Sequence, residues 1–288
     1  MKIARYWEKQ TAKGSDRGGK FIEATCWGWS ATDVSEARQR AGESAKRLLT
    51  VLISGDFAAL PHGYGYDQRP PREEIIDEIA DADGETHATV TRNSYGCLIL
   101  NTRDLMFIDV DFPNRPPTVP LPRFVRKLLG QPDPPNDPEM VLDRVRKSAG
   151  QYPQYGYRIY RTKNGYRIMV HTDPVTSQSP QAAQLLDAFD ADPLYRRLCK
   201  HQECFRARLT PKPWRLHLRN PPCRYPLKGP LEKADYQRWD EGYRKEAEKF
   251  GTCRYVESIG PADCCEELRG LIDLHDGLTK ALSDDPLA

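Results

Sequence analysis

The feature that most constrains the fold is a pair of short runs joined by Asn164-Gly165. Residues 155–161 and 166–171 both alternate in character, and in the second run Tyr, Ile and Val alternate with Arg, Met and His. Such alternation places one set of side chains on each face of a strand. Asn-Gly between two runs of this kind is the strongest short-range signal for a hairpin. We therefore expect an antiparallel or mixed sheet built around these residues.

The rest of the chain alternates between strand-like and helix-like segments, which predicts an α+β fold. Two strands at residues 2–10 and 20–29 and a helix capped by Ser30 or Thr32 and ended by Gly55 are expected to form an N-terminal β-β-α unit. Further strands are expected at residues 87–93, 95–100, 105–111, 204–209 and 252–258. Further helices are expected at residues 72–80, 140–149, 180–189, 193–200, 232–250 and 264–282, with helices on one face of the sheet. Proline-rich stretches at 61–71 and 113–139 are expected as loops.

These segments suggest three parts: the β-β-α unit over residues 1–60, an α+β core with a basic patch over 61–230, and a helix–strand–helix extension over 231–288. The chain has neither an apolar signal-peptide core at its start nor an apolar run that approaches the roughly 20 residues of a membrane span. We therefore expect a cytoplasmic protein with no membrane partner.

The eight cysteines include no C-x-x-C pair, and in this setting free thiols are expected. Cys199, His201 and Cys204, with Cys223 further on, are the nearest approach to a zinc motif. Their spacing is irregular and lacks the paired cysteines of strong zinc motifs. Zinc is therefore an unlikely cofactor, and buried thiols are the preferred interpretation.

Two aspartates stand at the end of an apolar strand. Residues 105–108 are apolar, and Asp109, Val110 and Asp111 then alternate acid, apolar, acid. The two carboxylates share one face of the strand and should repel each other unless a cation lies between them. Oxygen ligands of this kind suit Mg²⁺ or Mn²⁺. Asp109 and Asp111 are therefore candidate metal ligands and catalytic residues, with two solvated acids at a strand end as the alternative.

Basic residues cluster at two later places. The hairpin carries Lys163, Asn164, Arg167 and His171 next to a tight turn, an arrangement suited to phosphate. Residues 196–228 hold ten Lys and Arg against one acid, in a chain whose net charge is only +2. A patch of this kind binds phosphates of nucleotides or of a nucleic-acid backbone. The candidates are Arg206 and Arg208 for a nucleotide, and Arg196, Arg197, Lys200, Lys212, Trp214, Arg215 and Arg219 for nucleic acid.

An acid pair, a basic hairpin and a basic strand follow in an order that resembles the archaeo-eukaryotic primase and primase-polymerase superfamily. Phe107-Ile-Asp-Val-Asp111 is similar to the family's metal-binding motif, and residues 162–170 are similar to its nucleotide-binding motif, with Arg167 where a histidine is usual. The resemblance covers roughly residues 90–215 and implies an RRM-like catalytic core. It also implies metal-dependent nucleotidyl transfer on a DNA or RNA template, with two metal ions held by Asp109 and Asp111. The family's third acid has no clear counterpart on the strand at 205–209.

Two other functions remain open from the sequence. A non-catalytic nucleic-acid-binding accessory protein of a mobile element or defence system would keep the basic surface and a degenerate acid site. A phosphodiesterase or nuclease could use the acid pair, or His171-Thr172 and His217-Leu218, which faintly resemble the paired motifs of two-histidine phosphoesterases. The partners expected in all three cases are nucleic acid, nucleotides or both.

Overall fold

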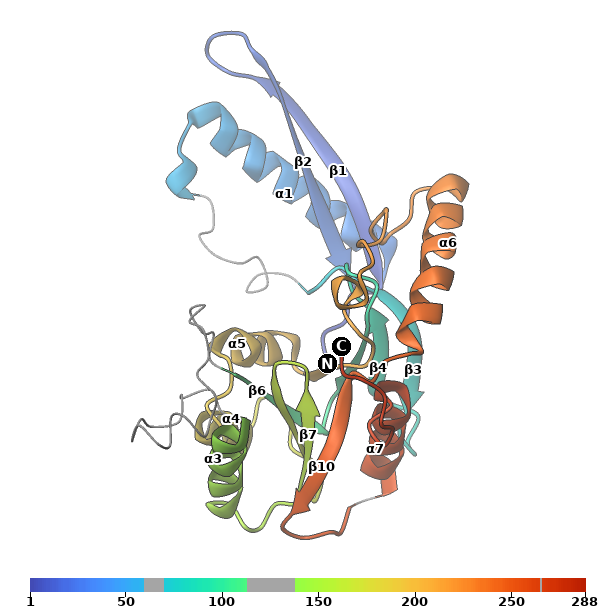
Figure 1. Cartoon of the computed structure of the whole chain (residues 1–288). Helices are drawn as coiled ribbons and strands as arrows, with labels where there is room; N and C mark the ends of the chain where they lie inside the picture. The colour runs from blue at the N-terminus through green and yellow to red at the C-terminus, as the bar shows by residue number, and fades with distance from the viewer. Residues whose placement is uncertain (60–69, 113–137, 265) are drawn as a thin grey trace, which may run out of the picture.

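The computed structural model describes residues 1–59, 70–112, 138–264 and 266–288 and has an α+β fold whose sheets are antiparallel, as the sequence predicts (Figure 1). The proline-rich loops expected at 61–71 and 113–139 lie almost entirely outside the described residues. No helix in the described ranges combines the length and the apolar character needed to cross a membrane.

The N-terminal unit is a long hairpin with one helix against it. Strands β1 (Tyr6–Ser15) and β2 (Phe21–Ser30) pair along their whole length, and α1 (Val34–Ser54) packs on them. The helix is capped by Asp33, which accepts from the Glu36 N–H at 2.9 Å, so the predicted caps Ser30 and Thr32 are wrong by a few residues. Gly55 ends it in the left-handed conformation, as expected. Figure 1 shows this unit projecting from the rest of the molecule.

The first four-stranded sheet has the order β3-β4-β5-β9. Its strands are β3 (Glu74–Ala80), β4 (Thr86–Arg92), β5 (Leu98–Thr102) and β9 (Phe205–Arg208). The helix predicted at 72–80 is therefore wrong. The β3–β4 register shifts between Ile75 and Asp77 and again after Ile79, and such bulges break the two-residue period of a strand. The isoleucines of this edge strand consequently have spacings that also fit a helix.

The second four-stranded sheet holds the predicted hairpin at its centre and has the order β10-β7-β8-β6. Its strands are β6 (Met106–Asp111), β7 (Tyr157–Thr162), β8 (Gly165–Val170) and β10 (Cys253–Ile259). The side chains of β6, β7 and β8 form the main hydrophobic core together with residues of the neighbouring helices. The C-terminal part of the chain thus contributes β10 to this sheet.

Helices cover both faces of this second sheet, whereas the sequence suggested one. Figure 1 shows α3 (Pro138–Gly150) and α4 (Pro180–Ala188) on one side and α7 (Glu266–Thr279) on the other. The Tyr166 hydroxyl donates to the Pro138 carbonyl of α3, and the rings of Phe107 and Tyr160 contact His275 of α7. Two more helices, α5 (Pro193–Gln202) and α6 (Pro230–Ala247), flank the first sheet and its loops.

The turn of the central hairpin consists of Lys163 and Asn164, and Gly165 is the first residue of β8. A side chain at Gly165 would clash with the Val110 carbonyl oxygen of β6. The absence of a side chain at Gly165 therefore lets β6 and β8 pair as far as Asp111. The backbone that lies closely against Gly165 is that of β6.

A partly buried tyrosine joins the two four-stranded sheets. The Tyr195 hydroxyl of α5 donates to the Phe107 carbonyl of β6 at 2.9 Å and lies 3.3 Å from both the backbone N and the backbone O of Arg206 on β9. This contact fixes the end of β9 beside β6, where the acidic and basic candidates meet.

Candidate phosphate-binding site

Asp109 is held by an arginine on the neighbouring strand. The β6–β8 register pairs Asp109 with Arg167, and the guanidinium places Nε 2.9 Å from Oδ1 and Nη2 3.3 Å from Oδ2 of that carboxylate. The Arg167 side chain is 3% exposed and that of Asp109 is 38% exposed. Burial by itself would lower the pKa of Arg167, but the Asp109 carboxylate outweighs it and the pKa is raised. Arg167 is thus a charged group whose counterion is Asp109.

The same arginine begins a chain of hydrogen bonds beneath α7. Its Nη1 donates to the Arg208 carbonyl at 2.9 Å and lies 3.4 Å from Nε2 of His275. The other ring nitrogen of His275 lies 2.9 Å from Oδ1 of Asp276, whose Oδ2 accepts from Arg158 at 2.6 Å. Burial lowers the pKa of His275, so the ring is neutral, with its proton on Nδ1 facing Asp276. Two ion pairs, Arg167–Asp109 and Arg158–Asp276, therefore flank the neutral ring of His275. We interpret this network as structural.

Asp111 is in a different situation from Asp109. No ion pair or hydrogen bond reaches its carboxylate within the described part of the chain. Burial raises its pKa first, and the negative charges of Asp109 and Asp192 raise it further. Asp192 is the nearest approach to the third acid, but its carboxylate caps α5 by accepting from the Leu194 N–H at 2.9 Å. The positive charges of Lys212 and Arg215 lower the pKa of Asp111 again in part, so Asp111 has no direct ion pair among the described residues and lies between two acids and two cations.

A divalent metal would suit Asp111 better than it suits Asp109. Both Asp109 oxygens already accept from Arg167, and Asp192 is committed to its helix. Across the described ranges, no group of three His, Cys, Asp or Glu side chains is close enough together to hold a metal ion. Asp109 and Asp111 remain the residues that would hold Mg²⁺ or Mn²⁺, with water completing the coordination.

Three cations that form no ion pair within the described part of the chain lie beside this strand end. Arg208 at the end of β9, Lys212 in the following loop and Arg215 in the short helix η3 (Pro213–Leu216) form no ion pair within the described residues. One guanidinium nitrogen of Arg208 and one of Arg215 are buried without a hydrogen-bond partner. We call Arg208, Lys212 and Arg215 the cationic cluster. Unsatisfied buried donors of this kind are costly and need a partner.

The members of the cationic cluster affect one another's pKa values, which indicates that they lie close together. Burial is the first cause that lowers the pKa of each, and it takes that of Arg208 to about 10. The second cause for Lys212 is the charge of Arg208, followed by that of Arg215. The Asp111 carboxylate raises the pKa values of Lys212 and Arg215 and so lies near both. The Asn164 amide, turned to accept, lies 3.2 Å from Nη2 of Arg215.

Arg206, in contrast, is neutralised. It lies two residues before Arg208 on the same face of β9, but it has its own partners: Glu73 accepts from its Nη2 at 2.7 and 2.9 Å, and Gln202 accepts from its Nη1 at 3.0 Å. Glu73 is the partner that sequence reasoning missed, since an acid after two prolines and an arginine gives no hint of a partner 133 residues away.

The other residues predicted in the hairpin lie elsewhere. Lys163 donates to the Leu287 carbonyl at 3.0 Å. His171 follows the far end of β8, about 13 Å along the strand from Arg167 at the usual rise per residue. It is 5% exposed and lines a cavity beside α7, while His217 caps η3. His171 is therefore distant from the Asp109 end of the sheet.

The residues predicted to bind nucleic acid fall into two groups. Arg196, Arg197 and Lys200 of α5 line a cavity of about 630 Å³ between α4 and α5, where Arg196 pairs with Asp187. The second group follows β9 along residues 212–219. There Trp214 is 46% exposed, with Lys212 Nζ 5.3 Å from its ring centre and the Tyr95 ring 5.1 Å away, edge to face. Arg219 is exposed, and its carbonyl accepts from Trp239.

The three cysteines of the possible zinc motif are free thiols, two of them buried and Cys223 partly buried. Cys199 and Cys204 are fully buried, and burial raises the pKa values of their thiols to about 12 and about 11. Cys223 lies in the loop before α6, where its thiol contacts the Glu232 carbonyl.

Comparisons with known proteins found no matching family model, no matching curated protein and no matching solved structure.

Proposed function

We propose that this protein binds nucleic acid through its phosphates and that the cationic cluster of Arg208, Lys212 and Arg215 is the centre of the binding surface. The observation that carries the proposal is that these three cations lie together, partly buried, and form no ion pair among the described residues, although the charge of Asp111 is near Lys212 and Arg215. Holding like charges together costs free energy, and an anion between them recovers it. Asn164 beside Arg215 would supply a neutral hydrogen-bonding group at the same place.

A nucleic acid suits the surroundings better than an isolated phosphate does. Trp214 lies next to the cationic cluster with an exposed ring, and aromatic rings of this kind stack on the bases of single strands. The basic cavity lined by Arg196, Arg197 and Lys200 belongs to α5, whose capping residue Asp192 is close enough to raise the pKa of Asp111. Phosphates of one strand spaced along these elements would meet cations on both sides of the acid pair.

The test is fluorescence anisotropy with a labelled single-stranded oligonucleotide of about 20 nucleotides. We expect wild-type protein to bind and Arg215→Gln to bind at least about tenfold more weakly, the factor for one charge-assisted hydrogen bond. The matched control is Arg238→Gln, since Arg238 is an exposed arginine of α6 that pairs with Asp235. Absence of binding, or equal affinity of wild type and Arg215→Gln, would count against the proposal.

A second candidate is metal-dependent nucleotidyl transfer at Asp111 and Asp109. What favours it is that Asp111 faces the charges of Asp109 and Asp192, a concentration of negative charge that a divalent cation would relieve. Arg167 would have to share Asp109 with the metal. Template-dependent incorporation of labelled nucleotide with Mg²⁺ or Mn²⁺, lost in Asp111→Ala, is the expected result. No incorporation on any template would reject the enzyme and leave the binding function in place.

A further inference from the structure

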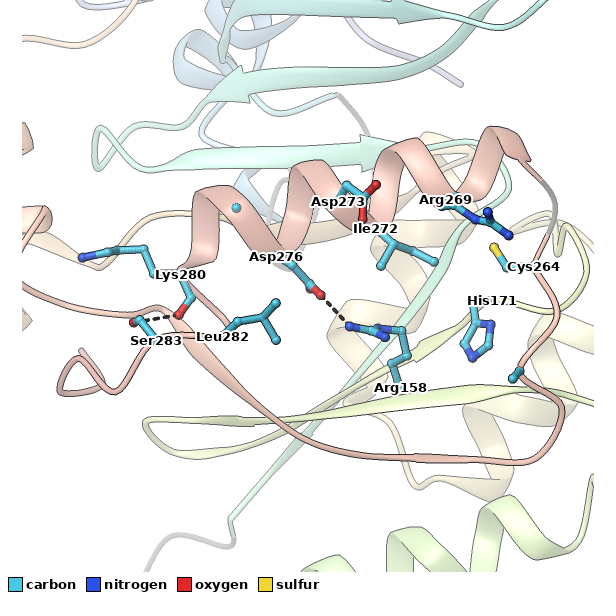
Figure 2. A pocket seen from close by; sticks show the side chains of 12 residues that line it. Arg158, His171, Cys264, Arg269, Ile272, Asp273, Asp276, Lys280, Leu282 and Ser283 are labelled. Carbon is cyan, nitrogen blue, oxygen red and sulfur yellow. Dashed lines mark hydrogen bonds and ion pairs between the residues drawn. The ribbon is translucent and has the colours of Figure 1, made fainter.

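A second cavity lies far along the central sheet from the cationic cluster, between α7 and the ends of β7 and β8. Its volume is about 680 Å³ (Figure 2). The residues that line it include the cations Arg158, Arg269 and Lys280, the acids Asp273 and Asp276, and His171. Neither of the two functions proposed above uses this cavity.

One end of the cavity presents three side chains with nitrogen atoms that have no hydrogen-bond partner among the described residues. His171 is only 5% exposed, and its buried Nδ1 atom has no hydrogen-bond partner in the part of the chain that the structure describes. Arg158 uses Nε on the Tyr160 hydroxyl and Nη2 on Asp276, which leaves Nη1 unused within the described residues. Arg269 makes no ion pair or hydrogen bond in the same ranges. In Figure 2, Arg158 extends from its strand toward α7, and His171 and Arg269 lie at the same end of the cavity.

The acids of the cavity do not neutralise this end. Asp276 is already shared between His275 and Arg158, at 2.9 and 2.6 Å. Lys280 pairs with Asp285, and Asp273 lies on the solvent-exposed side of α7. The positive charge of Arg158 reaches His171, because it lowers the pKa of that imidazole after burial has done so. The open end of the cavity is thus electropositive.

We propose that Arg158, His171 and Arg269 form a second anion-binding site, which takes a small molecule with a phosphate or carboxylate group. The anion would accept from Arg158 Nη1, from the Arg269 guanidinium and from the imidazole, and Arg158 would stay in contact with Asp276. Ile272 and Leu282 of the same cavity would cover an apolar part of the ligand. This inference does not depend on the proposed nucleic-acid binding.

The test follows the histidine ring by NMR. Protein labelled at its six histidines is titrated with inorganic phosphate and, separately, with acetate, at an ionic strength held constant with sodium chloride. His171→Gln assigns the resonance. We expect a saturable shift of the His171 signals and a higher His171 pKa in the anion-bound state, since a bound anion stabilises the imidazolium. A response to phosphate alone would assign a phosphate ester, and a response to acetate alone or to both would assign a carboxylate-tolerant site.

Three variants separate this site from other anion sites. Arg269→Gln, at an exposed position, should weaken anion binding at least about tenfold, as for the loss of one charge-assisted hydrogen bond. Arg215→Gln and Arg238→Gln should leave the His171 titration unchanged. His275 should shift with the same dissociation constant as His171, because Asp276 joins its ring to Arg158. Silence of His171 toward both anions, an unaltered affinity in Arg269→Gln, or a response of His275 without His171 would each overturn the proposal.

Discussion

Replacing Asp109 by asparagine should destabilise the protein, and replacing Asp111 by asparagine should not. Arg167 is almost fully buried and has Asp109 as its counterion. An asparagine would leave that guanidinium charged and without a carboxylate, while Arg208 O and His275 keep it in place. Breaking a buried ion pair costs about 3–5 kcal/mol, and the partial exposure of Asp109 reduces the expected loss to about 2–4 kcal/mol.

Asp111→Asn is the matched control, two residues along the same strand. Burial and the charges of Asp109 and Asp192 raise the pKa of Asp111 above that of the unfolded chain. An acid with a raised folded pKa lowers stability at pH values above that pKa, so neutralising it should leave the free energy of unfolding at pH 7 unchanged or higher. The gain should disappear in acid, where the carboxyl group is protonated in both states.

The assay is urea denaturation of wild type and both variants at pH 7, with thermal unfolding as a second probe. For a chain of this size, about 2–4 kcal/mol corresponds to a fall of roughly 3–7 °C in Tm. The reasoning would be refuted if Asp109→Asn were as stable as wild type, or if Asp111→Asn were the more damaging change. If Asp109 and Asp111 were instead two unpaired acids of an empty metal site, either substitution should stabilise the protein. For Asp109 this is the opposite of the result we expect.

The remaining predictions concern other parts of the chain. Gly28→Ala should destabilise the N-terminal unit strongly, because a Cβ there would clash with the backbone of α1, whereas Gly42→Ala in open space should stabilise the helix by about 0.5–1 kcal/mol in denaturation experiments. Glu73→Gln should cost about 3–5 kcal/mol by leaving Arg206 buried without a counterion, as measured by urea denaturation. Burial lowers the pKa of His171, so the folded protein binds fewer protons than the unfolded chain in mild acid. Stability should therefore fall as the pH drops below about 6.5, and His171→Gln should reduce this fall in a pH series of unfolding curves.

The sequence predicted the fold class well where local patterns decide it. The alternation along 166–171 and the Asn164 turn gave the central hairpin, and the N-terminal β-β-α unit followed from strand patterns and Gly55. The failure at residues 72–80 arose because β3 carries two bulges, so its isoleucines lose the period of a strand. Pairing with β4 is a non-local interaction that no window of that segment can reveal.

The candidate site was predictable in its residue types but not in its pairing. Asp109, Asp111, Arg208, Lys212 and Arg215 do meet at one strand end. Which cation neutralises which acid depends on strand register and on distant segments, as the contacts of Arg167 and Arg206 show. Sequence alone treated all these arginines as equal phosphate ligands.

The salt dependence of oligonucleotide binding tests the central claim most directly. Each phosphate contact on a single strand contributes about 0.7 to the slope of log K against log salt concentration. If the cationic cluster holds phosphates, the double variant Lys212→Gln/Arg215→Gln should show a slope smaller in magnitude by about 1.4, since two contacts are lost. The control Arg238→Gln should keep the wild-type slope. An unchanged slope in the double variant would mean that these cations do not contact phosphate and would contradict the account.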